Sequence, residues 1–331
     1  MKILCTGSCG YVGSALVPRL LAEGHEVTGY DTCWFGDGNW SHENANARLV
    51  KGDIRDLEKL RAALEGQEAV IHLACISNDH SCQLDEALST SINYDAFEPL
   101  VIAAKRAGVR RFIYCSSSSV YGLSDAPDVT EDHPLVPLTL YNRYKGMCEP
   151  LLFKHQSPEF VCCTIRPATV CGYAPRQRFD LTVNIMTNHA VQNSLITVFG
   201  GEQKRPNLHI RDMVQCYVTL LEAPDRTIAG QTFNVGAQNM KVRDIARLVQ
   251  EVVQDEFPRK RVEIVTRPVQ DNRSYHINSD KIRRALGFTP KFTVEDAVRD
   301  LCMRFQLGMF RDSMTNPWYS NVLQLMEKQV A

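Results

Sequence analysis

The chain lacks an excess of charge of one sign, a long apolar run and a metal-binding spacing of cysteines. Its 331 residues carry a formal net charge of -1, whereas a nucleic-acid-binding protein normally shows a basic excess. No stretch approaches the ~18 apolar residues of a membrane-spanning helix. The 12 cysteines form no C-x-x-C pair and no zinc-binding pattern. We therefore expect no nucleic-acid partner, no membrane span and no bound metal.

The composition is that of an ordinary globular protein with a buried core. Apolar residues make up 44% and charged residues 23%, and the length allows one large domain or two smaller ones. Most cysteines lie in apolar runs, which favours reduced, buried thiols. The N-terminal apolar stretch is similar to a signal peptide, but Gly7, Gly10 and Gly13 interrupt it. We therefore expect a cytoplasmic location.

Three evenly spaced glycines follow the first apolar run. Lys2–Thr6 is expected to form a buried strand, and apolar residues recur at helical spacing from Gly13 to Gly24. A glycine turn between a strand and a helix is the context of a phosphate-binding loop, because the helix N-terminus offers free N–H groups. The spacing is G-x-x-G-x-x-G, not the common G-x-G-x-x-G. A turn that serves packing alone is therefore the alternative.

A single acidic residue ends the second expected strand. Glu26–Tyr30 is apolar enough for a strand, and Asp31 follows it directly. A carboxylate at this position of a dinucleotide-binding fold accepts hydrogen bonds from a ribose diol and repels a 2′-phosphate. Asp31 therefore favours NAD over NADP, unless it serves only as a loop or cap residue.

Apolar runs and helical patterns alternate along the first half of the chain. Residues 70–75 predict a strand, and a histidine such as His72 in that run is more often a packed core residue than a catalyst. Asn93 lies in a helical pattern that extends to Ala107. Further strands are expected at 48–51, 111–116 and 160–166, and a helix at 57–64. This alternation predicts an α/β fold with a doubly wound parallel sheet.

Tyr141 and Lys145 are four residues apart in a helical pattern, so they share one helix face. A free phenol has a pKa near ~10 and is a poor base at neutral pH, but a neighbouring ammonium favours the phenolate. The run Ser116–Ser119 follows an expected strand, and strand ends are where open parallel sheets place ligands. Such a trio suits taking a proton from an alcohol whose carbon gives up a hydride. Alone, the Tyr–Lys pair would be a chance surface pair.

The order and spacing of these motifs resemble the extended short-chain dehydrogenase/reductase family, in its branch of NAD-dependent sugar-nucleotide epimerases and dehydratases. The likeness covers nearly the whole chain. The matching elements are Thr6-Gly7-x-x-Gly10-x-x-Gly13, Asp31, Gly52-Asp53, His72-Leu73-Ala74, Asn93, the Ser-Ser-x-x-Val-Tyr-Gly stretch at 116–122, and Tyr141-x-x-x-Lys145.

The resemblance implies a Rossmann-like NAD-binding domain at residues 1–166, with a returning segment near 208–237. A smaller C-terminal α/β substrate-binding domain would comprise residues 167–207 and 238–331. The resemblance also implies NAD as the cofactor, a nucleotide-activated sugar as the substrate, and a homodimer built through a four-helix bundle.

It further implies a set of site residues. Ser117, Tyr141 and Lys145 would be catalytic. Cofactor contacts are implied for Gly7, Gly10, Tyr11, Val12, Gly13, Asp31, Asp53, Ile54, Leu73, Ala74, Asn93, Tyr141 and Lys145. Substrate contacts are implied for Ser117, Ser118, Thr169, Asn184, Val198, Arg205 and Arg273.

The second half of the chain departs from the family pattern at one motif. Thr169 stands where an asparagine is usual, and Cys171 where a tyrosine is common. A threonine can donate or accept a hydrogen bond but reaches less far than asparagine. Arg205 resembles the family's phosphate-binding arginine, and the planar guanidinium suits that role.

Other residues of this half leave alternatives open. Arg176 and Arg178, in a basic loop, either face an anionic ligand or are solvated. Arg273 is favoured over Arg267 as the second phosphate-binding arginine. The segment 309–331 matches no family element that we can assign.

The family's chemistry implies that Tyr141 takes the proton from the sugar 4-hydroxyl, with Ser117 bonded to the same oxygen. The 4,6-dehydratase branch carries an Asp-Glu pair just after the active-site Ser or Thr, and here those positions are Ser118 and Ser119. We therefore favour a 4-epimerase, with a 4-dehydrogenase or reductase as the main alternative. Dehydration ranks lower, and so does a non-enzymatic NAD sensor, because the three catalytic residues are present.

Asp31 generates a prediction about the cofactor. We expect the protein to bind NAD more tightly than NADP, because the carboxylate would repel the 2′-phosphate. Calorimetric titration with both dinucleotides measures this difference, and tighter binding of NADP would refute the assignment of Asp31.

Overall fold

The computed structural model describes residues 1–331 except 39, 41, 125, 269–273 and 331. In the described part, seven parallel strands form one sheet in the order β10-β6-β5-β4-β1-β2-β3. Their bounds are β1 Lys2–Thr6, β2 Glu26–Asp31, β3 Ala47–Lys51, β4 Ala69–His72, β5 Arg111–Cys115, β6 Val161–Pro167 and β10 Gln231–Val235. The prediction of a doubly wound parallel sheet is confirmed.

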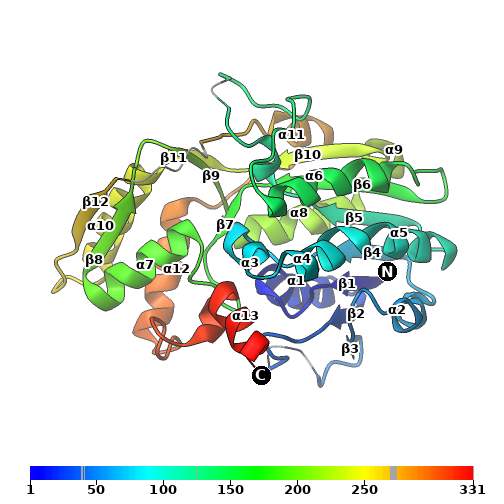
Figure 1. The fold of residues 1–331 in the computed structure, drawn as a ribbon, viewed down its shortest axis with the longest axis horizontal. Helices are drawn as coiled ribbons and strands as arrows, with labels where there is room; N and C mark the ends of the chain where they lie inside the picture. The colour runs from blue at the N-terminus through cyan, green and yellow to red at the C-terminus, as the bar shows by residue number, and fades with distance from the viewer. Residues whose placement is uncertain (39, 41, 125, 269–273, 331) are drawn as a thin grey trace.

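Helices cover both faces of this sheet (Figure 1). Side chains alternate between the faces, so Ile3 and Cys5 join one hydrophobic cluster and Leu4 joins the other. The first face is covered by α1 (Tyr11–Ala22) and α8 (Ile210–Glu222), and the second by α2 (Leu57–Leu64), α5 (Phe97–Arg106) and α6 (Leu140–Phe153). Because both faces are buried, the strands are the near-continuous apolar runs seen in the sequence.

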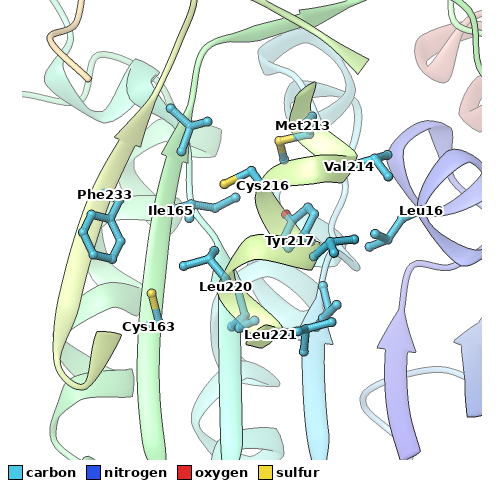
Figure 2. Packing of buried hydrophobic residues seen from close by; sticks show 14 of the residues in the cluster. Leu16, Cys163, Ile165, Met213, Val214, Cys216, Tyr217, Leu220, Leu221 and Phe233 are labelled. Atoms are coloured by element: carbon cyan, nitrogen blue, oxygen red, sulfur yellow. The ribbon is translucent and has the colours of Figure 1, made fainter. Parts of the chain in front are cut away.

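Figure 2 shows how α8 packs on the first face. Tyr217, Leu220 and Leu221 of the helix lie over the sheet, close to Ile165 of β6 and Leu16 of α1. The helix is amphipathic, and these side chains are at most 5% exposed. The segment from 208 to 237 therefore returns to the first sheet, where it supplies both α8 and the edge strand β10.

The remaining strands form two smaller sheets beside the large one (Figure 1). One has the order β11-β9-β7, and the other pairs β12 with β8. Their bounds are β7 Thr169–Cys171, β8 Leu195–Phe199, β9 Lys204–His209, β11 Gln238–Lys241 and β12 Glu263–Arg267. A separate hydrophobic cluster joins them to α7 (Thr182–Asn193), α10 (Val242–Glu256) and α12 (Val294–Gln306).

Short helices complete the described structure. Their bounds are α3 Asp79–Leu84, α4 Glu86–Thr90, the π-helical turn η1 Ser91–Asp95, the 3-10 turn η2 Ser118–Tyr121, α9 Asp225–Ile228, α11 Asp280–Leu286, the 3-10 turn η3 Pro317–Tyr319 and α13 Asn321–Val330. Among the described residues, no helix has the length and apolar character needed to cross a membrane.

Two element predictions need correction. The fourth strand ends at His72, not Cys75. After His72 the chain leaves the sheet, and the N–H groups of Leu73 and Ala74 donate to the carbonyl and the hydroxyl oxygen of Thr6. The helical pattern through Asn93 is not one helix: α4, the π turn and α5 follow one another. π turns concentrate at functional sites, and Asn93 uses this one to bond both the N–H and the C=O of Ile76.

A buried ion pair joins α6 to the sheet. The guanidinium of Arg166 on β6 contacts both carboxylate oxygens of Glu149 on α6, with Nη2 2.6 Å from Oε2. The Ser116 hydroxyl donates to Glu149 Oε1 at 2.6 Å, and Arg166 Nη1 donates to the Tyr121 hydroxyl at 2.7 Å. The pair therefore holds the helix of Tyr141 against the strand end that leads to Ser117.

Removing one partner of this ion pair tests how much the pair contributes to the stability of the fold. Glu149→Ala would leave the Arg166 charge buried, so we expect the free energy of unfolding to fall by about 3–5 kcal/mol. Urea denaturation measures the change. As a control, Glu26→Ala removes an exposed pair with Lys2 and should cost roughly 0–1 kcal/mol. Equal effects of the two substitutions would contradict this assignment.

Candidate active site

A cavity of about 720 Å³ runs along the carboxyl ends of the strands and reaches the second set of sheets. Most of the predicted site residues line it, although they come from segments far apart in the chain. The predicted residues in its lining are Gly7, Gly10, Tyr11, Val12, Gly13, Asp31, Asp53, Ile54, Leu73, Ala74, Ser117, Tyr141, Lys145, Thr169 and Arg205.

Other predicted residues lie outside the lining described for this cavity. Asn93 is buried behind it and positions Ile76. Asn184 is also buried, and its amide bonds Gly172 N and the Tyr11 hydroxyl. Val198 is buried in the hydrophobic cluster that joins the two smaller sheets to α7, α10 and α12. Ser118 is 1% exposed. Arg273 lies outside the described residues.

The glycine turn is packed too closely for side chains. A Cβ on Gly7, whose φ is +75°, would lie 2.7 Å from Ala74 N, and a Cβ on Gly13 would lie 2.4 Å from Gly7 O. Helix α1 then begins at Tyr11, and Gly10 caps it without a side-chain hydrogen bond. The free N–H groups of the first turn and the positive end of the helix dipole suit an anionic group such as a diphosphate.

Asp31 both shapes its loop and lines the cavity. Its Oδ2 accepts from Cys9 N at 3.0 Å and its Oδ1 from Cys33 N at 2.7 Å. Burial raises the pKa of Asp31, whereas these two backbone donors and the charge of Arg176 act to lower it. The cap interpretation and the ligand interpretation are therefore compatible, because each oxygen keeps a lone pair that can accept from a ribose hydroxyl.

Packing brings Cys9, Asp31 and Cys33 together, although no sequence spacing indicates it. Their potential ligand atoms all lie within 4.8 Å of one another, and the two sulfurs are 4.0 Å apart. Burial is the main cause that raises the pKa of both thiols. Both carboxylate oxygens of Asp31 are held by backbone N–H groups, so the absence of a metal stays our prediction.

Ser117, Tyr141 and Lys145 all line the cavity, and Lys145 lies at the end of β5. Lys145 Nζ donates to Cys115 O at 2.6 Å and lies 5.8 Å from the centre of the Tyr141 ring. Ser117 Oγ lies 2.7 Å from Ser119 Oγ, and Ser119 donates a short hydrogen bond to Asn142 Oδ1. This Ser119–Asn142 link, which sequence reasoning missed, fixes Ser117 relative to the helix of Tyr141.

The electrostatics around Tyr141 differ from the simple expectation. Burial raises the pKa of its phenol well above the usual range, the thiols of Cys75, Cys115 and Cys82 add to the rise, and Arg178 opposes it. Arg178 thus enters as a cation that favours the phenolate. The lowering of the Tyr141 pKa by Lys145 stays a prediction.

Arg176 and Arg178 are not solvated: their exposed fractions are 1% and 8%. Arg178 forms a two-point ion pair with Asp180, with Nε 2.8 Å from Oδ1 and Nη2 3.1 Å from Oδ2. Its Nη1 also donates to Ser77 Oγ at 3.2 Å. Burial acts to raise the pKa of Asp180, but Arg178, the backbone N–H of Asn321 and the charge of Arg176 together lower that pKa.

The C-terminal segment, unassigned from the sequence, closes one side of the cavity. Trp318 Nε1 donates to Phe35 O at 2.7 Å, and Asn321 donates to Asp180 Oδ2 at 3.0 Å and to Ser77 Oγ at 2.7 Å. Asn321 and Val322 are part of the cavity lining. Trp318 and Tyr319 are adjacent aromatic residues in this segment, and such a pair is a sequence signal for packing against the rest of the chain.

Comparison with known proteins supports the same interpretation. The sequence model of the NAD dependent epimerase/dehydratase family matches residues 3–236. The chain belongs to this family. A UDP-glucose 4-epimerase from Corynebacterium glutamicum is 27% identical over 322 residues, covering 90% of this chain and 94% of that protein. The family prediction made from the motifs is therefore confirmed.

Solved structures of similar proteins share the fold. The UDP-glucuronic acid 4-epimerase from Bacillus cereus, in complex with UDP-glucuronic acid and NAD, has a TM-score of 0.81 and 25% identity, covering 93% of this chain and 99% of that one. The dTDP-glucose 4,6-dehydratase DesIV from Streptomyces venezuelae, with NAD and TYD bound, has a TM-score of 0.83 and 22% identity, covering 96% and 100%.

Family membership makes the protein an NAD-dependent enzyme, and the cavity fits that cofactor. The glycine turn and the start of α1 suit the diphosphate, and Asp31 suits a ribose diol. Each of these features is a property of this chain's own residues.

Proposed function

We propose that the enzyme is a nucleotide-sugar 4-epimerase. The observation that carries the proposal is the shared cavity of Ser117, Tyr141 and Lys145 with the glycine turn and Asp31. The similarity to 4-epimerases that act on UDP-glucose and UDP-glucuronic acid supports it. We infer that the substrate is a sugar activated by a nucleoside diphosphate.

Each of the three residues has a proposed task. Tyr141 takes the proton of the sugar 4-hydroxyl and later returns it. Ser117 bonds the same oxygen, and the Ser119–Asn142 link keeps it in position. Lys145, held by Cys115 O, binds the nicotinamide ribose and supplies positive charge near the phenol. When bound, NAD would supply the acceptor and then the donor for the C4 hydride, and the keto sugar would turn over in the site between the two transfers.

The serine turn argues against 4,6-dehydration. Eliminating water across C5 and C6 requires an acid and a base beside the sugar. Ser118 is buried and Ser119 is bonded to Asn142, so the two positions after Ser117 hold hydroxyl groups where that reaction needs carboxyl groups. A serine hydroxyl cannot replace such a pair.

Arg205 is our candidate for the substrate diphosphate. It lines the cavity, and its guanidinium lies 5.9 Å from the centre of the Tyr275 ring. Thr169, also in the lining, would contact the sugar or its phosphates. Ser118, Asn184 and Val198 were predicted to contact the substrate, but they lie outside the lining described for the cavity. We propose that they support the cavity wall instead.

The division into domains is likewise a proposal. The end of β6 at Pro167 and the return of the chain in α8 and β10 support an NAD-binding part at 1–166 and 208–237. Residues 167–207 and 238–331 would form the substrate-binding part. The homodimer and the cytoplasmic location stay predictions.

Tyr141→Phe tests the proton transfer. We expect turnover to fall roughly 100- to 10,000-fold, with NAD binding retained, because only the hydroxyl is lost. Steady-state kinetics and the NAD content of the purified variant measure the two effects. Tyr144→Phe is the matched control: it lies on the same helix, and its hydroxyl bonds Thr90. Near-normal activity of Tyr141→Phe would rule out this mechanism.

The nature of the product tests the reaction. We expect a panel of UDP-, GDP-, dTDP- and CDP-sugars to yield one pair of C4 epimers, identified by NMR and mass spectrometry. A 4-keto-6-deoxy sugar would show dehydration, and a released 4-keto sugar with stoichiometric NADH would show a 4-dehydrogenase. Either result would overturn the epimerase proposal.

A further inference from the structure

We propose that Arg176 binds the diphosphate of the NAD cofactor and so provides a charged side chain beside the glycine turn. The inference rests on NAD as the cofactor of this family, and it concerns a residue outside the motifs that carry the resemblance. It would make the loop after β7 part of the cofactor site.

Arg176 is fixed close to the start of helix α1. Its backbone N–H donates to Ser14 Oγ at 3.0 Å, and Ser14 N in turn donates to Gly10 O at 2.9 Å. The Arg176 side chain lines the same cavity as Gly10, Gly13 and Asp31. The Arg176 backbone is therefore fixed beside the first turn of α1, and a dinucleotide-binding fold receives the diphosphate at the N-terminal end of that helix.

The guanidinium is buried without hydrogen-bond partners for two of its nitrogens. Among the described residues, nothing accepts from Nε or Nη2, although Arg176 is only 1% exposed. Burial, with the nearby charge of Arg178, lowers its pKa to about 9. An isolated buried charge is costly, and a buried polar group without a partner points to a missing ligand or ion.

The neighbouring charges do not supply that partner. Asp180 is engaged by both nitrogens of the Arg178 fork. Asp31 attracts Arg176 electrostatically, but its two oxygens accept from Cys9 N and Cys33 N. Arg178 is thus neutralised within the protein, whereas Arg176 keeps its positive charge for something that enters the cavity.

Aromatic rings set the orientation of Arg176. The carbon of its guanidinium lies 3.7 Å from the centre of the Phe35 ring and 6.0 Å from Trp318. At this distance the Phe35 ring covers a face of the guanidinium, so the N–H groups along its edges are not used by the ring. Edges of this shape bind phosphate oxygens in pairs. Trp318 also bonds Phe35 O, so the C-terminal segment helps to hold the stack.

The position favours the cofactor's diphosphate over other anions. A 2′-phosphate would lie against the Asp31 carboxylate, which repels it. The substrate diphosphate is assigned above to Arg205, on β9. The hydrogen bond to Ser14 ties Arg176 to the helix that follows the glycine turn.

Arg176→Met in the full-length protein tests the inference with ADP as the diphosphate probe and adenosine as the probe without phosphate. By calorimetry of nucleotide-free protein, we expect ADP and NAD to bind roughly 10- to 100-fold more weakly, as for a lost hydrogen bond to a charged group. Adenosine should bind within about 2-fold of wild type. Arg283→Met, which changes an exposed arginine on α11, is the control and should alter neither.

Two further measurements exclude a merely structural role. The melting temperature of nucleotide-free Arg176→Met should equal or exceed that of the wild type, because an unpaired buried charge has been removed. Arg176→Lys keeps the charge without the planar fork, so its loss of ADP affinity should be intermediate; this variant also serves if the methionine variant does not fold.

Several outcomes would overturn the inference. Unchanged ADP affinity in Arg176→Met would do so, as would an equal loss for adenosine, a loss confined to NADP, or a loss seen with UDP but not with ADP. These binding results are independent of the product analysis. If the enzyme catalyses a reaction other than epimerisation, the inference about Arg176 is unaffected. If the wild-type protein binds neither ADP nor NAD, the inference is wrong.

Discussion

The buried ion pair between Arg166 and Glu149 is the interaction on which the arrangement of the active site depends. One carboxylate receives the guanidinium of β6 and the hydroxyl of Ser116, and it belongs to the helix that carries Tyr141 and Lys145. A buried pair is tolerated only when its geometry is close and its remaining atoms are bonded. The strand end and the helix therefore cannot shift independently, so Ser117 and the Tyr141–Lys145 pair, to which we assign the catalysis, keep a fixed separation.

Charged side chains in the cavity differ in the kind of partner that they have. Asp31 is held by backbone N–H groups, Arg178 by Asp180, and Lys145 by a backbone carbonyl. Arg176 alone among these has buried N–H groups without a partner in the described structure. The diphosphate of NAD carries negative charge, and we infer that this unpaired guanidinium, covered on one face by Phe35, is there to bind it.

Much of the fold could be predicted because buried parallel strands are apolar runs bounded by turns. Lys2–Thr6 and Glu26–Tyr30 were expected as such runs, and both lie in strands, the second of which extends to Asp31. The prediction failed where periodicity carries no information about hydrogen bonding. A π turn has nearly the side-chain pattern of a helix, so the interruption at Ser91–Asp95 was invisible. The early end of β4 likewise depends on Thr6, 66 residues away from His72.

The local chemistry can be read from the amino-acid sequence alone: the glycine turn, the acid after the second strand, and the tyrosine and lysine on one helix face. These depend on spacings of a few residues, which backbone geometry converts directly into position. Which arginine is paired, and what the C-terminal segment covers, became clear from the folded chain and not from the sequence. Arg176 meets Ser14 across 162 positions and Trp318 meets Phe35 across 283. Contacts of this range follow from packing of the whole chain, and no local pattern records them.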